Sequence, residues 1–407
     1  MALLACSGPT GLPPVPVPSP STAPLVSGLG STQQVLDDTL LAARRGDRAT
    51  FLLQLSPRDP AFGDRARQLF TNLSGLPLTQ LQGRLLPEQQ RLISAREQVL
   101  GGDAWMQAAT VTWRLAGDRA AAEHRVWFTF VRDGAGVRLA GLIDRPTTEP
   151  ALQQPSWWLG PVEAERRGPV TVVVGSGQSS GAWRTKVEGA LAQVLRHLPG
   201  AMGSIENPTL VVEVPATSAD FERIVGTPAG SYAEVAAATV AEGSTPQAAQ
   251  RIVVNPDAVR RLSAAGLNLT LTHEAVHVLT RSPESPAPAW AVEGLADWVA
   301  LQAHPEAAPA VAEPLLSEVA GHGPPAALPL DAEFDVGSGR LGLAYAEAWF
   351  ACRYVATSTS PDRLGRLYRE LDRGRTLDQA AGTVLGRSAA DLTGGWRDYL
   401  RTEAGLR

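Results

Sequence analysis

The apolar positions of residues 31–147 follow a helical spacing first and an alternating spacing afterwards. Ser31 opens a capped amphipathic helix, and the stretch 61–73 repeats apolar residues at helical intervals. Three strand-like runs follow, at 105–115, 124–131 and 137–143. Helices followed by a strand meander predict one α+β domain over residues 31–147.

A second pattern begins after the proline-containing polar stretch 148–156, which predicts a linker. Strands and helices then alternate, with strands expected at 170–174, 209–214, 234–240 and 251–255 and helices at 183–197 and 219–224. Beyond residue 298 the spacing is helical, and helices are expected at 311–320, 340–356, 362–372, 376–385 and 388–403. These elements predict a second domain over residues 157–407.

Residues 269–280 form the predicted helix that carries the candidate chemistry. His273 and His277 stand four residues apart, and Glu274 directly follows the first. At this spacing both imidazoles leave one helix face one turn apart, so they can close on one metal ion. Nitrogen ligands in an HExxH helix favour zinc, and Glu274 can deprotonate a water on that zinc. The segment therefore predicts a metallohydrolase.

A second predicted helix supplies a third ligand. Three prolines between residues 281 and 288 end the first helix, and the next helix begins near Trp290. If the two helices pack side by side, Glu293 lies opposite the histidine pair, and a fourth position stays open for water or substrate. Asp297 lies four residues later on the same face, where it could accept the remaining ring N–H of His273.

The segments His-Glu-Ala-Val-His at 273–277 and Pro-Ala-Trp-Ala-Val-Glu-Gly-Leu-Ala-Asp at 288–297 resemble the gluzincin zinc metallopeptidases, most closely the peptidase-MA-like proteins of bacterial cell envelopes. The resemblance implies a zincin-type fold and the hydrolysis of peptide bonds in peptides or proteins. It also implies that the strand 251–255 borders the cleft and pairs with extended substrate. A tyrosine or histidine would stabilise the oxyanion, and the candidates are Tyr345 and His322. The first domain is similar in pattern to the cone-shaped NTF2-like fold.

Other interpretations of these motifs stay open. The two histidines could be buried core residues, or the chain could bind zinc as a catalytically silent interaction module at the cell surface. Residues 175–181 match the Gly-x-Ser-x-Gly turn of serine hydrolases, with Ser179 as the nucleophile. They also approach a dinucleotide-binding loop, in which Ser180 takes the place of the third glycine. A polar loop without chemistry explains the same residues.

Composition narrows the possible partners. A net charge of −5 without long charge runs gives no surface that follows a phosphate backbone, so nucleic acid is not an expected partner.

The start, Leu3-Leu-Ala-Cys6, resembles a bacterial lipobox whose signal is truncated, and the Pro/Ser-rich residues up to 30 fit a disordered tether. We therefore expect an extracytoplasmic protein that reaches the membrane only through a lipid on Cys6. Cys352 lies in an apolar helical pattern and is expected to be a buried thiol.

Overall fold

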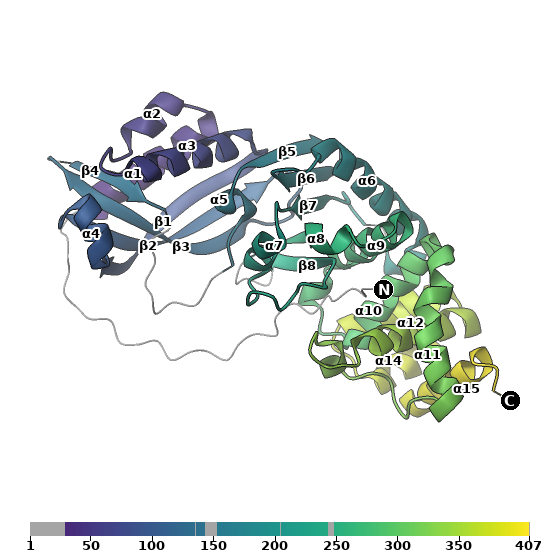
Figure 1. Ribbon diagram of the computed structural model, residues 1–407. Coiled ribbons are helices and arrows are strands. Elements are labelled where there is room, and N and C mark those ends of the chain that lie inside the picture. Colours follow the sequence, from purple (N-terminus) through teal and green to yellow (C-terminus); the bar gives the residue numbers. More distant parts are fainter. Residues whose placement is uncertain (1–28, 135, 143–152, 204, 243–247, 407) are drawn as a thin grey trace.

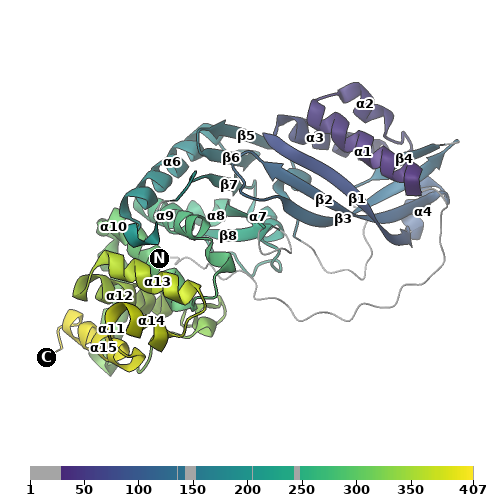
Figure 2. The same cartoon turned by 180° about the vertical axis from the view of Figure 1, so that it is seen from behind.

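The computed structural model describes residues 29–134, 136–142, 153–203, 205–242 and 248–406. The lipobox, residues 1–28 of the predicted tether, and residues 148–152 of the predicted linker lie outside these ranges. The described chain is a mixture of helices and two small sheets, which confirms the α+β class. Figures 1 and 2 show a first sheet, a second sheet and a helical part following one another along the molecule.

The first part has helices α1 (Leu29–Arg45), α2 (Arg48–Leu53), α3 (Pro60–Gly75) and α4 (Ser94–Leu100), and strands β1 (Leu78–Arg91), β2 (Ala104–Leu115), β3 (Ala122–Asp133) and β4 (Gly136–Gly141). The strands form an antiparallel sheet in the order β1-β2-β3-β4. The helices α1, α2 and α3 lie on one face of this sheet (Figure 1). The predicted helices and three strands are confirmed, whereas β1 was not predicted.

The sequence pattern did not predict strand β1, because a close helix contact and a bulge interrupt its alternation of apolar and polar residues. A Cβ atom at Gly83 would lie 2.8 Å from the side chains of both Leu36 and Leu40, so α1 approaches the strand backbone there. The pairing with β2 also shifts register between Leu85 and Gln89. The glycine is thus needed for a contact that local sequence cannot reveal.

The second part has helices α5 (Ser156–Leu159), α6 (Ser180–His197), α7 (Ser218–Val225), α8 (Pro256–Val259) and α9 (Ala264–Thr280), and strands β5 (Val162–Arg167), β6 (Val170–Gly175), β7 (Leu210–Val214), β8 (Ala237–Glu242) and β9 (Ala249–Val254). The sheet order is β5-β6-β7-β9-β8, with β6, β7 and β9 parallel and both outer strands antiparallel. The predicted strands and helices are confirmed here, and β5 is an addition.

Both faces of the second sheet are buried, which explains its nearly continuous apolar strands. Residues such as Val172 and Val212 face α6 and α9, whereas their neighbours Val173 and Val211 join the core of the first part. The first sheet and its helices are therefore packed directly on the second sheet.

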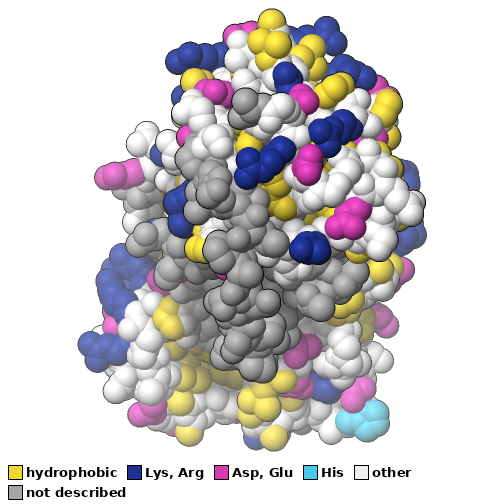
Figure 3. Space-filling view, turned by 90° about the vertical axis from the view of Figure 1, so that its left-hand side faces the viewer, with side chains coloured by type: hydrophobic (Ala, Val, Ile, Leu, Met, Phe, Trp, Pro, Cys, Tyr) yellow, Lys and Arg dark blue, Asp and Glu magenta, His cyan; other side chains and the backbone are white. Residues whose placement is uncertain are grey.

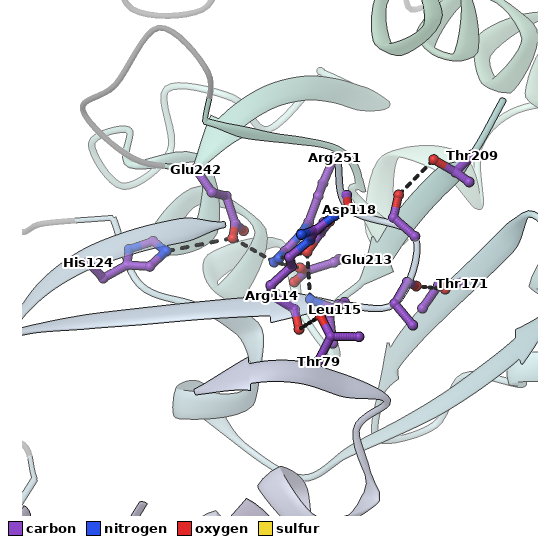
Figure 4. A network of polar contacts seen from close by, with 12 residues as sticks. Thr79, Arg114, Leu115, Asp118, His124, Thr171, Thr209, Glu213, Glu242 and Arg251 are labelled. Carbon is purple, nitrogen blue, oxygen red and sulfur yellow. Dashed lines mark hydrogen bonds and ion pairs between the residues drawn. The ribbon is translucent and has the colours of Figure 1, made fainter. Parts of the chain in front are cut away.

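One buried arginine links the two sheets. Arg251 on β9 is 0% exposed and donates two hydrogen bonds to Asp118, in the turn between β2 and β3, at 2.6 and 3.1 Å. It also donates to Glu213 on β7 at 2.8 Å and to Glu242 on β8 at 2.6 Å. Figure 4 shows these four residues, the Arg251 cluster, with His124 of β3 at 3.6 Å from Glu242. His124 is thus part of a structural network.

The third part contains the helices α10 (Ala289–Ala303), α11 (Ala308–His322), α12 (Leu341–Ser358), α13 (Pro361–Asp372), α14 (Leu377–Leu385) and α15 (Ala389–Glu403). The five helices predicted beyond residue 298 are confirmed within a few residues at each end. Cys352 is buried, and burial raises the pKa of its thiol. Within the described ranges, none of the helices combines the length and apolar character of a membrane span.

On the face turned to the viewer in Figure 3, the basic side chains lie interspersed with acidic ones. Among the described residues visible there, they form no continuous basic stripe.

Gly294 sets how closely α10 can approach α12. A Cβ atom there would lie 2.4 Å from the carbonyl oxygen of Ala348 and 2.8 Å from the sulfur of Cys352. Gly294→Ala is therefore expected to lower the free energy of unfolding by about 1–3 kcal/mol, because the helices must separate. Urea unfolding checks this. Gly189→Ala on α6 is the matched control, since its Cβ meets nothing within 4 Å, and it should stabilise by about 0.5–1 kcal/mol.

Candidate metal centre

Helix α9 presents the two histidines together, as their spacing predicts. Ser263 caps the helix by accepting from the Gly266 N–H, and all residues from 269 to 279 are buried. The rings of His273 and His277 lie 4.6 Å apart, and their Nε2 atoms are separated by 2.9 Å. Two nitrogen atoms at this separation can bind one ion.

Helix α10 brings Glu293 to the same point. Its Oε2 atom lies 3.2 Å from Nε2 of His273 and 3.3 Å from Nε2 of His277. Ligands about 2.0–2.1 Å from a tetrahedral metal are about 3.3 Å apart, so this triangle fits one such ion. The three residues form a buried group that could hold a metal ion.

Two further properties of Glu293 agree with a ligand role. Its Oε2 atom is buried and has no hydrogen bond of acceptable geometry within the described structure. Burial alone would raise its pKa, but His277 and His273 outweigh burial and lower the pKa to about 2. The side chain is therefore a carboxylate at neutral pH, the form that binds metal. For His273 the nearby Asp297 and Glu293 outweigh burial and raise the pKa to about 10, so a metal ion must displace a proton there.

Each histidine is oriented by a partner on its other nitrogen. Asp297 Oδ1 lies 2.7 Å from Nδ1 of His273, which is the contact that the sequence predicts. A carboxylate can only accept, so Nδ1 carries the proton and Nε2 is left for the metal. His277 also has a partner: Ser282 Oγ lies 2.6 Å from its Nδ1. This contact was not predicted.

Ser282 reaches His277 because the chain reverses at the end of α9. Arg281 adopts the left-handed conformation with φ 59°, and a short 3-10 helix, Ser282–Glu284, follows. Helical spacing does not extend across such a reversal. Proximity to the helix end and the three prolines were the only sequence features that pointed to this loop.

Ser282→Ala is expected to weaken zinc binding by about 10- to 100-fold, because His277 loses the group that fixes its ring. Competition with a chromophoric chelator measures this change. Thr280→Ala is a matched control, since its hydroxyl donates to backbone carbonyl oxygens of the same helix. Equal affinities of the two variants would contradict the orienting role of Ser282.

Glu274, the candidate base, is completely buried, and a residue of the second sheet holds its carboxylate. Its Oε2 atom accepts a hydrogen bond of 2.7 Å from the hydroxyl of Thr239 on β8.

The expectation that residues 251–255 border the cleft is wrong, because β9 lies inside the sheet with β7 and β8 on its two sides. The strand at that edge is β8. The order of the strands in the chain did not predict this arrangement, since β8 comes before β9 in the sequence but lies beyond it at the edge of the sheet.

The two oxyanion candidates differ in position. Tyr345 on α12 is buried, and its ring centroid lies 6.1 Å from that of His273 and 5.3 Å from that of Phe334. His322 lies in the last turn of α11, pairs with Glu318 at 3.2 Å, and is 77% exposed. The helix extends two residues further than predicted, so His322 is a surface residue of this helix. The structure brings only Tyr345 to the histidines.

Ser179 has a capping role. Its hydroxyl accepts from the N–H of Ala182 at the start of α6. Within the described chain, no histidine hydrogen-bonds to Ser179, so the partner that a serine nucleophile needs is missing there.

The sequence matches no protein-family model, and a search of curated proteins finds no relative of it.

Proposed function

We propose that this protein is a zinc-dependent peptidase that hydrolyses peptide bonds in proteins or peptides. The observation that carries the proposal is the triangle of His273 Nε2, His277 Nε2 and Glu293 Oε2, whose sides measure 2.9, 3.2 and 3.3 Å. The gluzincin-like order of the motif supports a peptidase over other hydrolases.

The donor set favours zinc among the common ions. Two imidazole nitrogens and one carboxylate are a borderline set of ligands, whereas calcium and magnesium prefer oxygen ligands alone. Three protein ligands also match catalytic zinc sites, which keep a fourth position open.

Bound zinc would supply Lewis acidity, which polarises a carbonyl and lowers the pKa of water towards about 7. Glu274 would take a proton at its carboxylate from the attacking water and return it to the leaving amine. Thr239 holds one carboxylate oxygen of Glu274 and so fixes the orientation of the base. Asp297 and Ser282 hold the histidine rings, and Tyr345 is our candidate for stabilising the oxyanion.

One observation favours a second function, a silent zinc-binding interaction module. His273, His277 and Glu293 are only 0%, 1% and 3% exposed, and structural zinc sites are typically closed to solvent. The two functions differ in their need for Glu274, because a structural site makes no use of a base beside the metal.

The first experiment is elemental analysis of the purified chain and of Glu293→Ala. We expect about one zinc per wild-type chain and little or none in the variant, because two imidazoles alone bind weakly. Glu313→Ala, an exposed change on α11, is the control and should keep its zinc. Circular dichroism verifies that all three chains are folded. Absence of zinc from folded wild type after reconstitution would overturn the metal site and with it the peptidase.

A further inference from the structure

A pocket lies at the C-terminal end of α9, the helix that carries His273 and His277. It encloses about 180 Å³ between the β2–β3 turn, the beginnings of β7 and β9, and the loop after α9. Its lining includes Gly117, Arg119, Thr209, Gln250, Val278 and Arg281. None of the three candidate metal ligands lines it, so it is a separate site.

The pocket carries more positive than negative charge. Arg119 and Arg281 line it together with Glu284, so the lining has two cations and one anion. Glu284 is already engaged, because it pairs with Arg281 at 2.5 Å and accepts from Gln250 at 3.0 Å. Arg119 has no hydrogen bond or ion pair within the described residues. Burial and the nearby charge of Arg281 both lower the pKa of Arg119.

The backbone that carries Arg119 is firmly held. Asp118 receives both hydrogen bonds from Arg251, the Gly117 carbonyl accepts from Thr209 at 2.7 Å, and the Ala116 carbonyl accepts from Thr171 at 2.5 Å. Figure 4 shows these contacts converging on the turn from β6, from β9 and from Thr209, which directly precedes β7. These contacts hold the turn in place, and the Arg119 side chain that it carries lines the pocket without a partner among the described residues.

We infer that this pocket binds a small oxyanion, a carboxylate or a phosphate, between the guanidinium groups of Arg119 and Arg281. A guanidinium offers parallel N–H donors that match the oxygens of either group. The anion would supply the missing negative charge and the partner that Arg119 lacks. The hydrophobic wall formed by Val211 and Val278 leaves room for a short organic substituent.

The site also adjoins the loop that supports His277. Arg281 directly precedes Ser282, whose hydroxyl contacts that histidine. An anion on Arg281 would restrain this loop, although binding of the anion itself does not depend on the proposed peptidase activity.

Calorimetric titration of chelator-treated protein with inorganic phosphate, and separately with acetate, tests the inference at constant ionic strength set by chloride. Removing metal first prevents either anion from binding as a ligand of the metal ion. We expect saturable binding of one anion per chain, at least about tenfold weaker in Arg119→Gln, because one charged hydrogen-bonding partner is lost. Arg119→Lys keeps the charge without the planar donors and should bind with intermediate affinity.

Arg196→Gln, an exposed change on α6, is the control for a general loss of positive charge and should bind like wild type. Binding of phosphate alone would identify a phosphate site, and binding of acetate as well would identify a site for carboxylates in general. The inference is overturned if neither anion saturates, or if Arg119→Gln and Arg196→Gln bind alike. Both failures can be told apart from failure of the metal site, since all samples are metal-free.

Discussion

Glu274→Gln is expected to lower peptide hydrolysis by about 10²- to 10⁴-fold, the usual contribution of a general base, while zinc stays bound. Glutamine keeps the shape of the side chain and an oxygen that can accept from Thr239, but it cannot take a proton at neutral pH. The three metal ligands are unchanged, so zinc content should equal that of the wild type.

The measurement uses zinc-loaded protein and a mixture of unstructured peptides, with cleavage followed by mass spectrometry. Thr239→Val is a companion variant, because it removes the hydroxyl on Glu274 and keeps the shape of the strand residue. It should lower turnover less than Glu274→Gln. Full turnover in Glu274→Gln would remove Glu274 as the base. No turnover in any zinc-loaded chain, wild type included, would favour the silent binding module.

Local sequence predicted the residues of the site whose spacing lies within one helix. His273 and His277 share a face of α9, and Glu293 and Asp297 share a face of α10. A period of 3.6 residues fixes such relations before any tertiary contact forms. The loop with its prolines indicated that the two helices can pack side by side, and the distances from Glu293 Oε2 to the two imidazoles agree.

The contacts that escaped prediction all join segments distant in sequence or cross a chain reversal. Thr239 reaches Glu274 from a strand 35 residues earlier, and its place depends on β8 being added outside β9. Ser282 depends on the left-handed turn at Arg281. His322 was misplaced because two additional helical residues moved it from a loop to a helix surface. Spacing gives the ligands and Asp297, whereas the supports from Thr239 and Ser282 follow only from the packing.

The Arg251 cluster is the clearest case of chemistry that no local pattern predicts. Asp118 and Arg251 are 133 residues apart in the chain, yet both side chains are 0% exposed. The guanidinium also lies 3.8 Å from the centre of the Trp113 ring. Three buried carboxylates share this one cation, and their combined charge raises the pKa of Arg251 despite its burial. Arg251 is therefore the one cation that these buried carboxyl groups of the two sheets share.

Arg251→Met is expected to lower the free energy of unfolding by about 3–5 kcal/mol, because it leaves three buried carboxyl groups without their cation. Methionine fills a similar volume, so the loss reflects charge and not a cavity. Urea unfolding of the variant and the wild type measures it. Glu213→Gln is the matched second change. Added to Arg251→Met it removes one buried charge and should restore about 0.5–3 kcal/mol.

The loss of unfolding free energy in Arg251→Met should also depend on pH, and the pKa of Glu213 determines its direction. Burial and the neighbouring Glu242 raise the pKa of Glu213 from 4.5 to about 7, although Arg251 opposes them. Between these values the folded state binds more protons than the unfolded chain, so the contribution of this group to stability falls as pH rises from about 4.5 to about 7. Arg251 lowers the pKa of Glu213, so without it this pKa rises further, and the deficit of the variant should be larger at pH 8 than at pH 5. A deficit that is equal at both pH values would mean that the three carboxyl groups are not held together in the folded protein.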